Sequence, residues 1–184
     1  MTRKFSKFRK SQNGATAIEF ALLALPFSAL LFAIVETAIV FFINSTMNHA
    51  VNEAARQIRT GIFQTDVGCA EDPAAFKTAV CDLMAGLGDC EGDMRIDVVS
   101  PNGDRFDPTA LAPPPDPGDS DDPEDVPASI YEDTGAGQVV IVRAQYYYPL
   151  ALPGELTFLS NRPGNVRLIQ TTTAFRNEPF PGTC

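Results

Sequence analysis

Two glutamates lie in or beside the most apolar stretch of the chain, and their side chains most need a chemical explanation. Glu19 directly precedes an apolar segment that runs from Phe20 to Ile43, and Glu36 lies well inside that segment. A carboxylate in apolar surroundings costs free energy unless a partner lies opposite, so both glutamates are candidate functional residues. Glu36 is either a pairing site or a residue at the edge of a bilayer, and the sequence leaves both interpretations open.

Residues suited to catalysis are scarce. The chain contains no Gly-x-Ser-x-Gly, no phosphate-binding glycine loop and no metalloprotease helix motif. His49 is the single histidine and has no candidate nucleophile beside it, so we expect it at the protein surface or the membrane boundary. The acidic segment 113–125 lacks the residue register of a calcium loop and is expected to be a solvated linker. We therefore expect no enzymatic activity, no catalytic residue, no metal and no cofactor.

Four cysteines offer a different kind of chemistry. None of their spacings is Cys-x-x-Cys and the chain has one histidine, which argues against a zinc site. In an oxidising compartment such cysteines form disulfides that stabilise a small domain. We expect Cys90 to pair with Cys69 or Cys81, and Cys184 to connect the end of the chain to this region.

The apolar segment has the length of a membrane span. Its 24 residues, Phe20 to Ile43, cover about 36 Å as a helix, whereas a bilayer core is about 30 Å thick. This is too long for the apolar part of a cleaved signal peptide. The net charge is -9, but the first 13 residues carry five basic and no acidic side chains, which leaves -14 for the rest. The positive-inside rule predicts a cytoplasmic N-terminus and an exported domain, whose acidity argues against nucleic-acid binding.

Helical periodicity continues beyond the apolar segment. Apolar residues recur at three- and four-residue steps from Met47 to Ile58, which indicates that an amphipathic helix follows. We expect one helix from about Thr16 to Thr60 that ends at Gly61; two helices separated at 44–45 are the alternative. A short helix should then begin at Pro73, with Asp72 as its cap. Strands are expected at 95–99, 138–148 and 167–175.

The start of the chain resembles a known family. Gly14 is followed by Ala-Thr-Ala-Ile-Glu-Phe and the apolar segment, which is similar to the processing signal of prepilin-like proteins. The same residues resemble the TadE family of the tight-adherence (Flp-type) pilus assembly system. Further similarity lies in Ile-Val-Glu at 34–36, Asn-Glu-Ala-Ala-Arg at 52–56 and Phe-Arg-Asn-Glu-Pro at 175–179. The resemblance is dense over residues 12 to 60 and local near the C-terminus.

The resemblance implies a pseudopilin or minor-pilin role in pilus assembly. A prepilin peptidase would cut after Gly14 and leave Ala15 as the new N-terminus, where type IV pilins favour a methylated phenylalanine. Glu19 would then be the fifth residue of the mature chain and pair with the N-terminal amine of a neighbouring subunit, with Phe20 and Glu36 as further assembly candidates. The implied partners are the peptidase, the membrane, and the major and other minor pilins or the assembly machinery.

Together, these observations predict an α+β, pilin-like protein. It would cross the bacterial inner membrane once and hold its domain in the periplasm or in a surface fibre, with a short helix and an antiparallel sheet of about three to four strands. A membrane-anchored exported binding module and a secreted hydrolase are the rival functions. The expected parts are a basic leader at 1–14, a transmembrane helix at 15–43, an amphipathic continuation at 44–61, and an exported soluble domain at 62–184 with an acidic proline-rich loop at 104–137.

Overall fold

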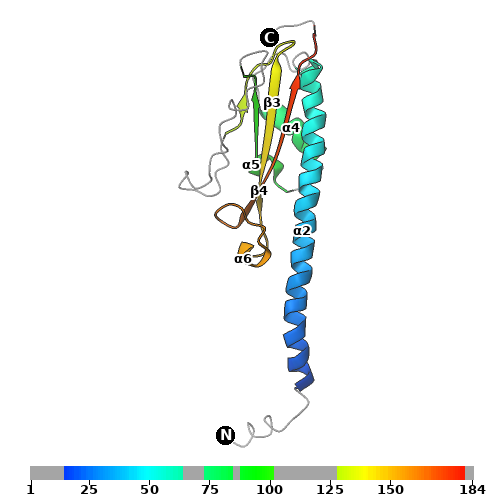
Figure 1. The fold of residues 1–184 in the computed structure, drawn as a ribbon, viewed down its shortest axis with the longest axis vertical. Helices are drawn as coiled ribbons and strands as arrows, with labels where there is room; N and C mark the ends of the chain where they lie inside the picture. The colour runs from blue at the N-terminus through cyan, green and yellow to red at the C-terminus, as the bar shows by residue number, and fades with distance from the viewer. Residues whose placement is uncertain (1–14, 64–72, 85–87, 102–127, 181–184) are drawn as a thin grey trace, which may run out of the picture.

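The computed structural model describes residues 15–63, 73–84, 88–101 and 128–180. Its dominant element is helix α2, Ala15–Arg59, which has 45 residues and projects far beyond a small domain (Figure 1). The helix is continuous through residues 44–45, so the prediction of a single long helix is confirmed. It ends where expected, because Gly61 adopts a positive φ of 77° that other residues seldom adopt.

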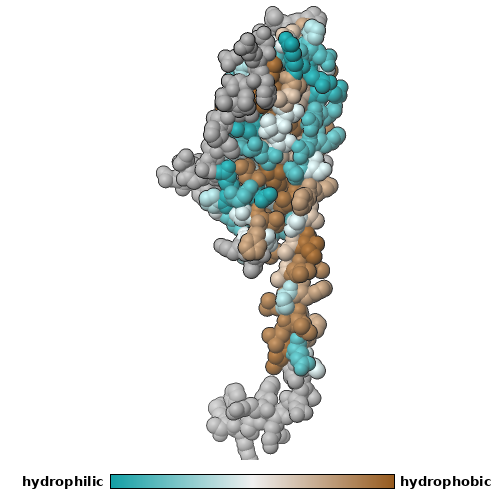
Figure 2. Space-filling view, in the orientation of Figure 1, coloured by the Kyte–Doolittle hydropathy of each residue, from teal (hydrophilic) through white to brown (hydrophobic). Residues whose placement is uncertain are grey.

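The two halves of α2 have different surroundings. Its exposed half, Ala15–Ile39, is apolar and mostly uncovered, and forms the brown stalk in Figure 2. Its packed half, Val40–Arg59, buries one face against the domain. The spacing of the buried residues follows the predicted amphipathic period: Val40, Ile43, Met47, Ala50, Val51, Ala54, Ala55 and Ile58.

A four-stranded sheet packs against the packed half of α2. The strands have the order β2-β1-β3-β4; β3 pairs antiparallel with both β1 and β4, whereas β1 and β2 are parallel. The α+β prediction with three to four strands is confirmed, but the expectation of a wholly antiparallel sheet is corrected by the β1–β2 pair. The bounds are Met94–Val99 for β1, Ile130–Tyr131 for β2, Val139–Pro149 for β3 and Val166–Arg176 for β4.

Strand β2 lies within the range 104–137 that the sequence assigned to an acidic loop. The strand has two residues, too few for the alternation that reveals a strand in a sequence. Its position beside β1 also depends on contacts from distant residues, which are described below.

The two faces of the sheet carry different side chains, because successive residues of a strand point to opposite sides. Met94, Ile96 and Val98 of β1 join the apolar core together with helix α2 and helix α4, Pro73–Leu83. The alternate residues Arg95 and Asp97 point to the other face. Every residue of β1 is nevertheless buried, so this second face holds charged groups away from water.

A disulfide connects α4 to the short helix α5, Cys90–Asp93. It joins Cys81 to Cys90, whose Cα atoms are 5.7 Å apart. Cys81 is one of the two partners that the sequence left open for Cys90. The other candidate, Cys69, and the proposed tail cysteine, Cys184, lie outside the described residues.

Replacing Cys81 and Cys90 together with alanine should lower the free energy of unfolding by about 2–3 kcal/mol, because a cross-link over a short loop restricts the unfolded chain. The two cysteines are nine residues apart in sequence. Denaturant unfolding of the full chain in detergent, followed by circular dichroism, measures the change. Thr78→Ala, at an exposed position of the same helix, is the matched control. Unchanged stability of the double variant would contradict the prediction.

Candidate functional site

The exposed half of α2 is the part of the described chain whose surface most requires an external partner. Among the described residues, α2 is the one helix with the length and apolar composition to cross a membrane. An apolar surface of this size is not stable in water and must be covered by lipid or by other helices. Its large exposed side chains are Ile18, Phe20, Leu22, Leu23, Leu25, Phe27, Leu30, Leu31, Phe32, Ile34, Val35 and Ile39.

Glu19 lies in the second turn of this exposed half. Its side chain is exposed, and no residue of the described part of the chain forms a hydrogen bond or ion pair with it. Phe20 beside it is 74% exposed. Both side chains are therefore open to contacts from outside the described part of the chain. Ala15 is the first residue of α2, and Gly14 lies outside the described residues.

Glu36 has a different environment from Glu19. Its side chain is only 4% exposed and points to the connection between β3 and β4. Its Oε1 accepts hydrogen bonds from the backbone N–H groups of Ala151, at 2.5 Å, and Leu152, at 3.2 Å. Its buried Oε2 has no hydrogen-bond partner among the described residues. Glu36 therefore attaches the helix to the domain within one chain.

Another polar contact, between α2 and strand β4, lies closer to the C-terminal end of the helix. The Thr171 hydroxyl of β4 donates a hydrogen bond to Oδ1 of Asn48. His49, the next residue, is exposed, as expected for a surface histidine. Together with the apolar face, the Asn48 contact fixes the packed half of α2 to the sheet. Glu36 attaches the end of the exposed half to the β3–β4 connection, whereas Glu19 lies far from the domain.

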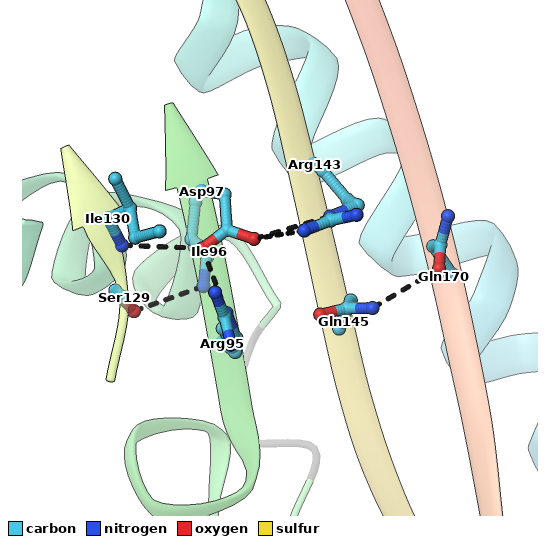
Figure 3. Close-up of polar contacts among 8 residues, drawn as sticks. All are labelled: Arg95, Ile96, Asp97, Ser129, Ile130, Arg143, Gln145 and Gln170. Carbon is cyan, nitrogen blue, oxygen red and sulfur yellow. Dashed lines mark hydrogen bonds and ion pairs between the residues drawn. The ribbon is translucent and has the colours of Figure 1, made fainter. Parts of the chain in front are cut away.

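Three charged residues form a buried cluster on the sheet face opposite α2 (Figure 3). Asp97 of β1 accepts from Nε of Arg95 at 2.9 Å and from Nη2 of Arg143 at 2.6 Å. Asp97 and Arg143 are direct cross-strand partners, so the strand register itself places the two charges together. This cluster was not predicted from the sequence, although the opposite charges of Arg95 and Asp97, two residues apart in a predicted strand, were a usable signal.

The same cluster holds strand β2 against β1. The backbone N–H of Ile130 donates to Asp97 Oδ1 at 3.3 Å, and that of Ile96 donates to the Ser129 hydroxyl at 3.1 Å (Figure 3). A further polar pair on this face links β3 to β4, where Gln145 Nε2 donates to Gln170 Oε1 at 3.2 Å. We interpret the cluster of Arg95, Asp97 and Arg143 as structural, because the three charged groups pair with one another and none of them is an activated nucleophile.

Burial is the main cause of the pKa shifts of Tyr146, Asp93 and Lys77 in the domain. Desolvation raises the pKa of Tyr146 to about 12, with the nearby Asp93 carboxylate adding to the effect. Desolvation also raises the pKa of Asp93 and lowers that of Lys77. The phenol of Tyr146 therefore stays neutral throughout the physiological range. Among the described residues, no group of three or more His, Cys, Asp or Glu side chains is placed to hold a metal ion.

These features define a class of protein: one helix of membrane-spanning length and composition continues directly into the core of a small α+β domain. The sequence model of the family described as TadE-like protein matches residues 14–56 of this chain. The matched segment begins at Gly14, contains Glu19 and Glu36, and ends three residues before α2 does. The similarity to this family thus covers most of the long helix, about a quarter of the chain. Neither the curated proteins nor the solved structures gave a match.

Proposed function

We propose that this chain is a non-enzymatic pseudopilin or minor-pilin-like protein of tight-adherence (Flp-type) pilus assembly, anchored in the bacterial inner membrane. The observation that carries the proposal is the TadE-like match from Gly14 to Arg56, which coincides with a helix whose exposed half carries Glu19. The basic leader stays in the cytoplasm, and the acidic domain lies on the periplasmic side of the membrane.

Processing by a prepilin peptidase after Gly14 is the first step of the proposed function. Ala15 is the first described residue of α2, so the cut would leave all of the described helix in the mature chain. The new amino group adds a positive charge to the positive end of the helix dipole. The mature chain then presents a cation at its N-terminus and a carboxylate, Glu19, one turn further along.

Pairing between subunits is the second step. In an apolar environment the Glu19 carboxylate is stabilised by a cation, and the new amino group of a neighbouring chain supplies one. The exposed apolar side chains of α2, including Phe20, then pack against the neighbouring helix. Glu19 is suited to this role because no described residue of its own chain pairs with it.

The test combines N-terminal sequencing with two variants expressed in a pilus-forming host. The wild-type chain in the membrane fraction should begin at Ala15, and Gly14→Ala should keep the leader and its larger size. The Glu19→Ala variant should still be processed and folded. It should lower the yield of fibres by about tenfold or more, because losing a charge pair in an apolar site costs more than about 1.4 kcal/mol of free energy. Glu53→Ala, at a partly exposed glutamate on the packed half, is the matched control.

Two outcomes would contradict this proposal. A mature chain that begins at Met1, with no size change in Gly14→Ala, would exclude processing. Normal fibre yield after residues 15–35 are replaced with an unrelated membrane helix would favour an anchored binding module instead, because the anchor would then carry no specific assembly contacts.

A further inference from the structure

Phe158 is the most exposed large hydrophobic side chain of the described residues, at 87%. Its backbone is also unusual, because its φ of 55° places a bulky residue in the left-handed region that glycine normally occupies. The conformation is fixed locally: the N–H of Phe158 donates to the carbonyl of Gly154 at 2.7 Å and ends the short helix α6, Gly154–Thr157. Neither burial within the chain nor backbone preference accounts for a phenylalanine here.

The position of Phe158 in the fold is informative. It belongs to the connection between β3 and β4, which forms the end of the domain nearest the exposed half of α2 (Figure 1). The start of this connection is hydrogen-bonded to Glu36 through the N–H groups of Ala151 and Leu152. The following residue, Leu159, lines one surface hollow together with Val40 and Phe41 of α2. Phe158 therefore lies close to the level of residues 36–41 along the helix.

If α2 crosses a bilayer, the outer edge of that bilayer lies near residues 36–41 of the helix, where Phe158 is also found. A hydrocarbon core of about 30 Å takes up about 20 helical residues, and the polar headgroup region adds about 5–7 Å on each side. Counted from Phe20, such a core ends near Ile39, three residues beyond Glu36. Exposed large apolar side chains on the helix continue to Phe41 and Phe42. The outer boundary of the hydrocarbon core thus coincides with the connection that carries Phe158.

We propose that the β3–β4 connection rests on the outer surface of the membrane that α2 crosses, with the Phe158 ring inserted at the boundary between headgroups and hydrocarbon. This inference rests on the membrane anchoring in the proposed function. Apolar side chains such as Phe and Leu insert into this boundary in proteins that lie on a membrane, and lipid contact explains why a large apolar side chain is held outward on a fixed turn. The domain is then attached to the membrane at two points, which fixes its orientation relative to the bilayer.

The chain contains no tryptophan, so a single introduced tryptophan reports its own surroundings. The full chain carrying Phe158→Trp is reconstituted at low protein density into phosphatidylcholine–phosphatidylglycerol vesicles, with and without brominated acyl chains. Phe32→Trp, in the exposed half of α2, is the reference inside the membrane. Ile62→Trp, at an exposed position three residues beyond the end of α2, is the reference in water. The packed half of α2 ends at the part of the domain away from the exposed half (Figure 1). Because Phe158 is exposed, its replacement leaves the packing of the domain intact.

The expected result is a blue-shifted Trp emission for Phe158→Trp that brominated lipids quench less than for Phe32→Trp and clearly more than for Ile62→Trp. Quenching in Phe32→Trp alone would overturn the proposal and leave the anchor intact. Absence of quenching in both Phe158→Trp and Phe32→Trp would overturn this proposal and would also contradict the membrane anchoring in the proposed function. Shielding of the residue-158 tryptophan from acrylamide without quenching by lipid would indicate a protein contact and would equally overturn the proposal.

Discussion

Asp97→Ala is expected to lower the free energy of unfolding by about 3–5 kcal/mol, the largest effect of any single substitution considered for this domain. Asp97 is 1% exposed and is the shared carboxylate of Arg95 and Arg143, which are themselves buried. The substitution removes the carboxylate that both the Arg95 and the Arg143 guanidinium groups contact on a poorly solvated face of the sheet. Such a loss costs more than an exposed ion pair because water does not replace the missing partner.

The same substitution should release strand β2. The N–H of Ile130 loses its side-chain acceptor on Asp97, so its hydrogen exchange should accelerate more than that of the central β3 amides. Asp97→Asn should be milder, because the amide oxygen still accepts one of the hydrogen bonds.

Denaturant unfolding of the full chain in detergent, combined with hydrogen exchange, measures both effects. Asp82→Ala, at an exposed aspartate of α4, is the matched control and should stay within about 0.5 kcal/mol of wild type. If Asp97→Ala were as stable as this control, the cluster would not contribute to the stability of the domain.

The second large effect is expected at Glu36. Glu36→Ala should reduce the protection of the Ala151 and Leu152 amides by about 1–3 kcal/mol, or about 5- to 150-fold in exchange rate. Both N–H groups donate to Glu36 Oε1, and the substitution leaves them without that acceptor. Glu36→Gln should retain most of the protection, because the amide still offers an oxygen in the same place.

Hydrogen exchange of the full chain in micelles resolves these amides. Glu53→Ala is the matched control on the same helix, since its ion pair with Arg56 is largely exposed and contributes little to stability. Unchanged protection in Glu36→Ala, together with a loss of fibres in cells, would instead assign Glu36 to contacts between subunits.

Most of the fold was predictable because its long elements carry strong periodic patterns. The continuity of α2 follows from apolar residues that pass without a break into a three- and four-residue repeat ending at Ile58. Strands β1, β3 and β4 lie within one or two residues of their predicted bounds, since each shows alternation or a run of β-prone residues. β2 was not predicted because it has only two residues, which are held by pairing with β1 and by a hydrogen bond from the Ile130 N–H to Asp97.

A residue of the candidate site could be predicted only where its neighbours in the sequence determine its environment. Glu19 was identified from its sequence neighbours, and the structure leaves it on the exposed half of α2. Glu36 was recognised as unusual, but its partners are backbone N–H groups 115 and 116 residues away, which no side-chain pattern reveals. The cluster around Asp97 depends on the register between β1 and β3, and single-strand alternation does not determine that register.

The absence of a break in α2 between its exposed and packed halves has a mechanical consequence. Because the packed half is built into the core, force applied to the domain passes along backbone hydrogen bonds into the exposed half, with no flexible linker to stretch first. Pro26 is the proline inside this helix, and its missing N–H makes it the point of easiest bending. Pulling or rotating the domain therefore moves the helix with it down to Pro26, as a rod rather than as a tether.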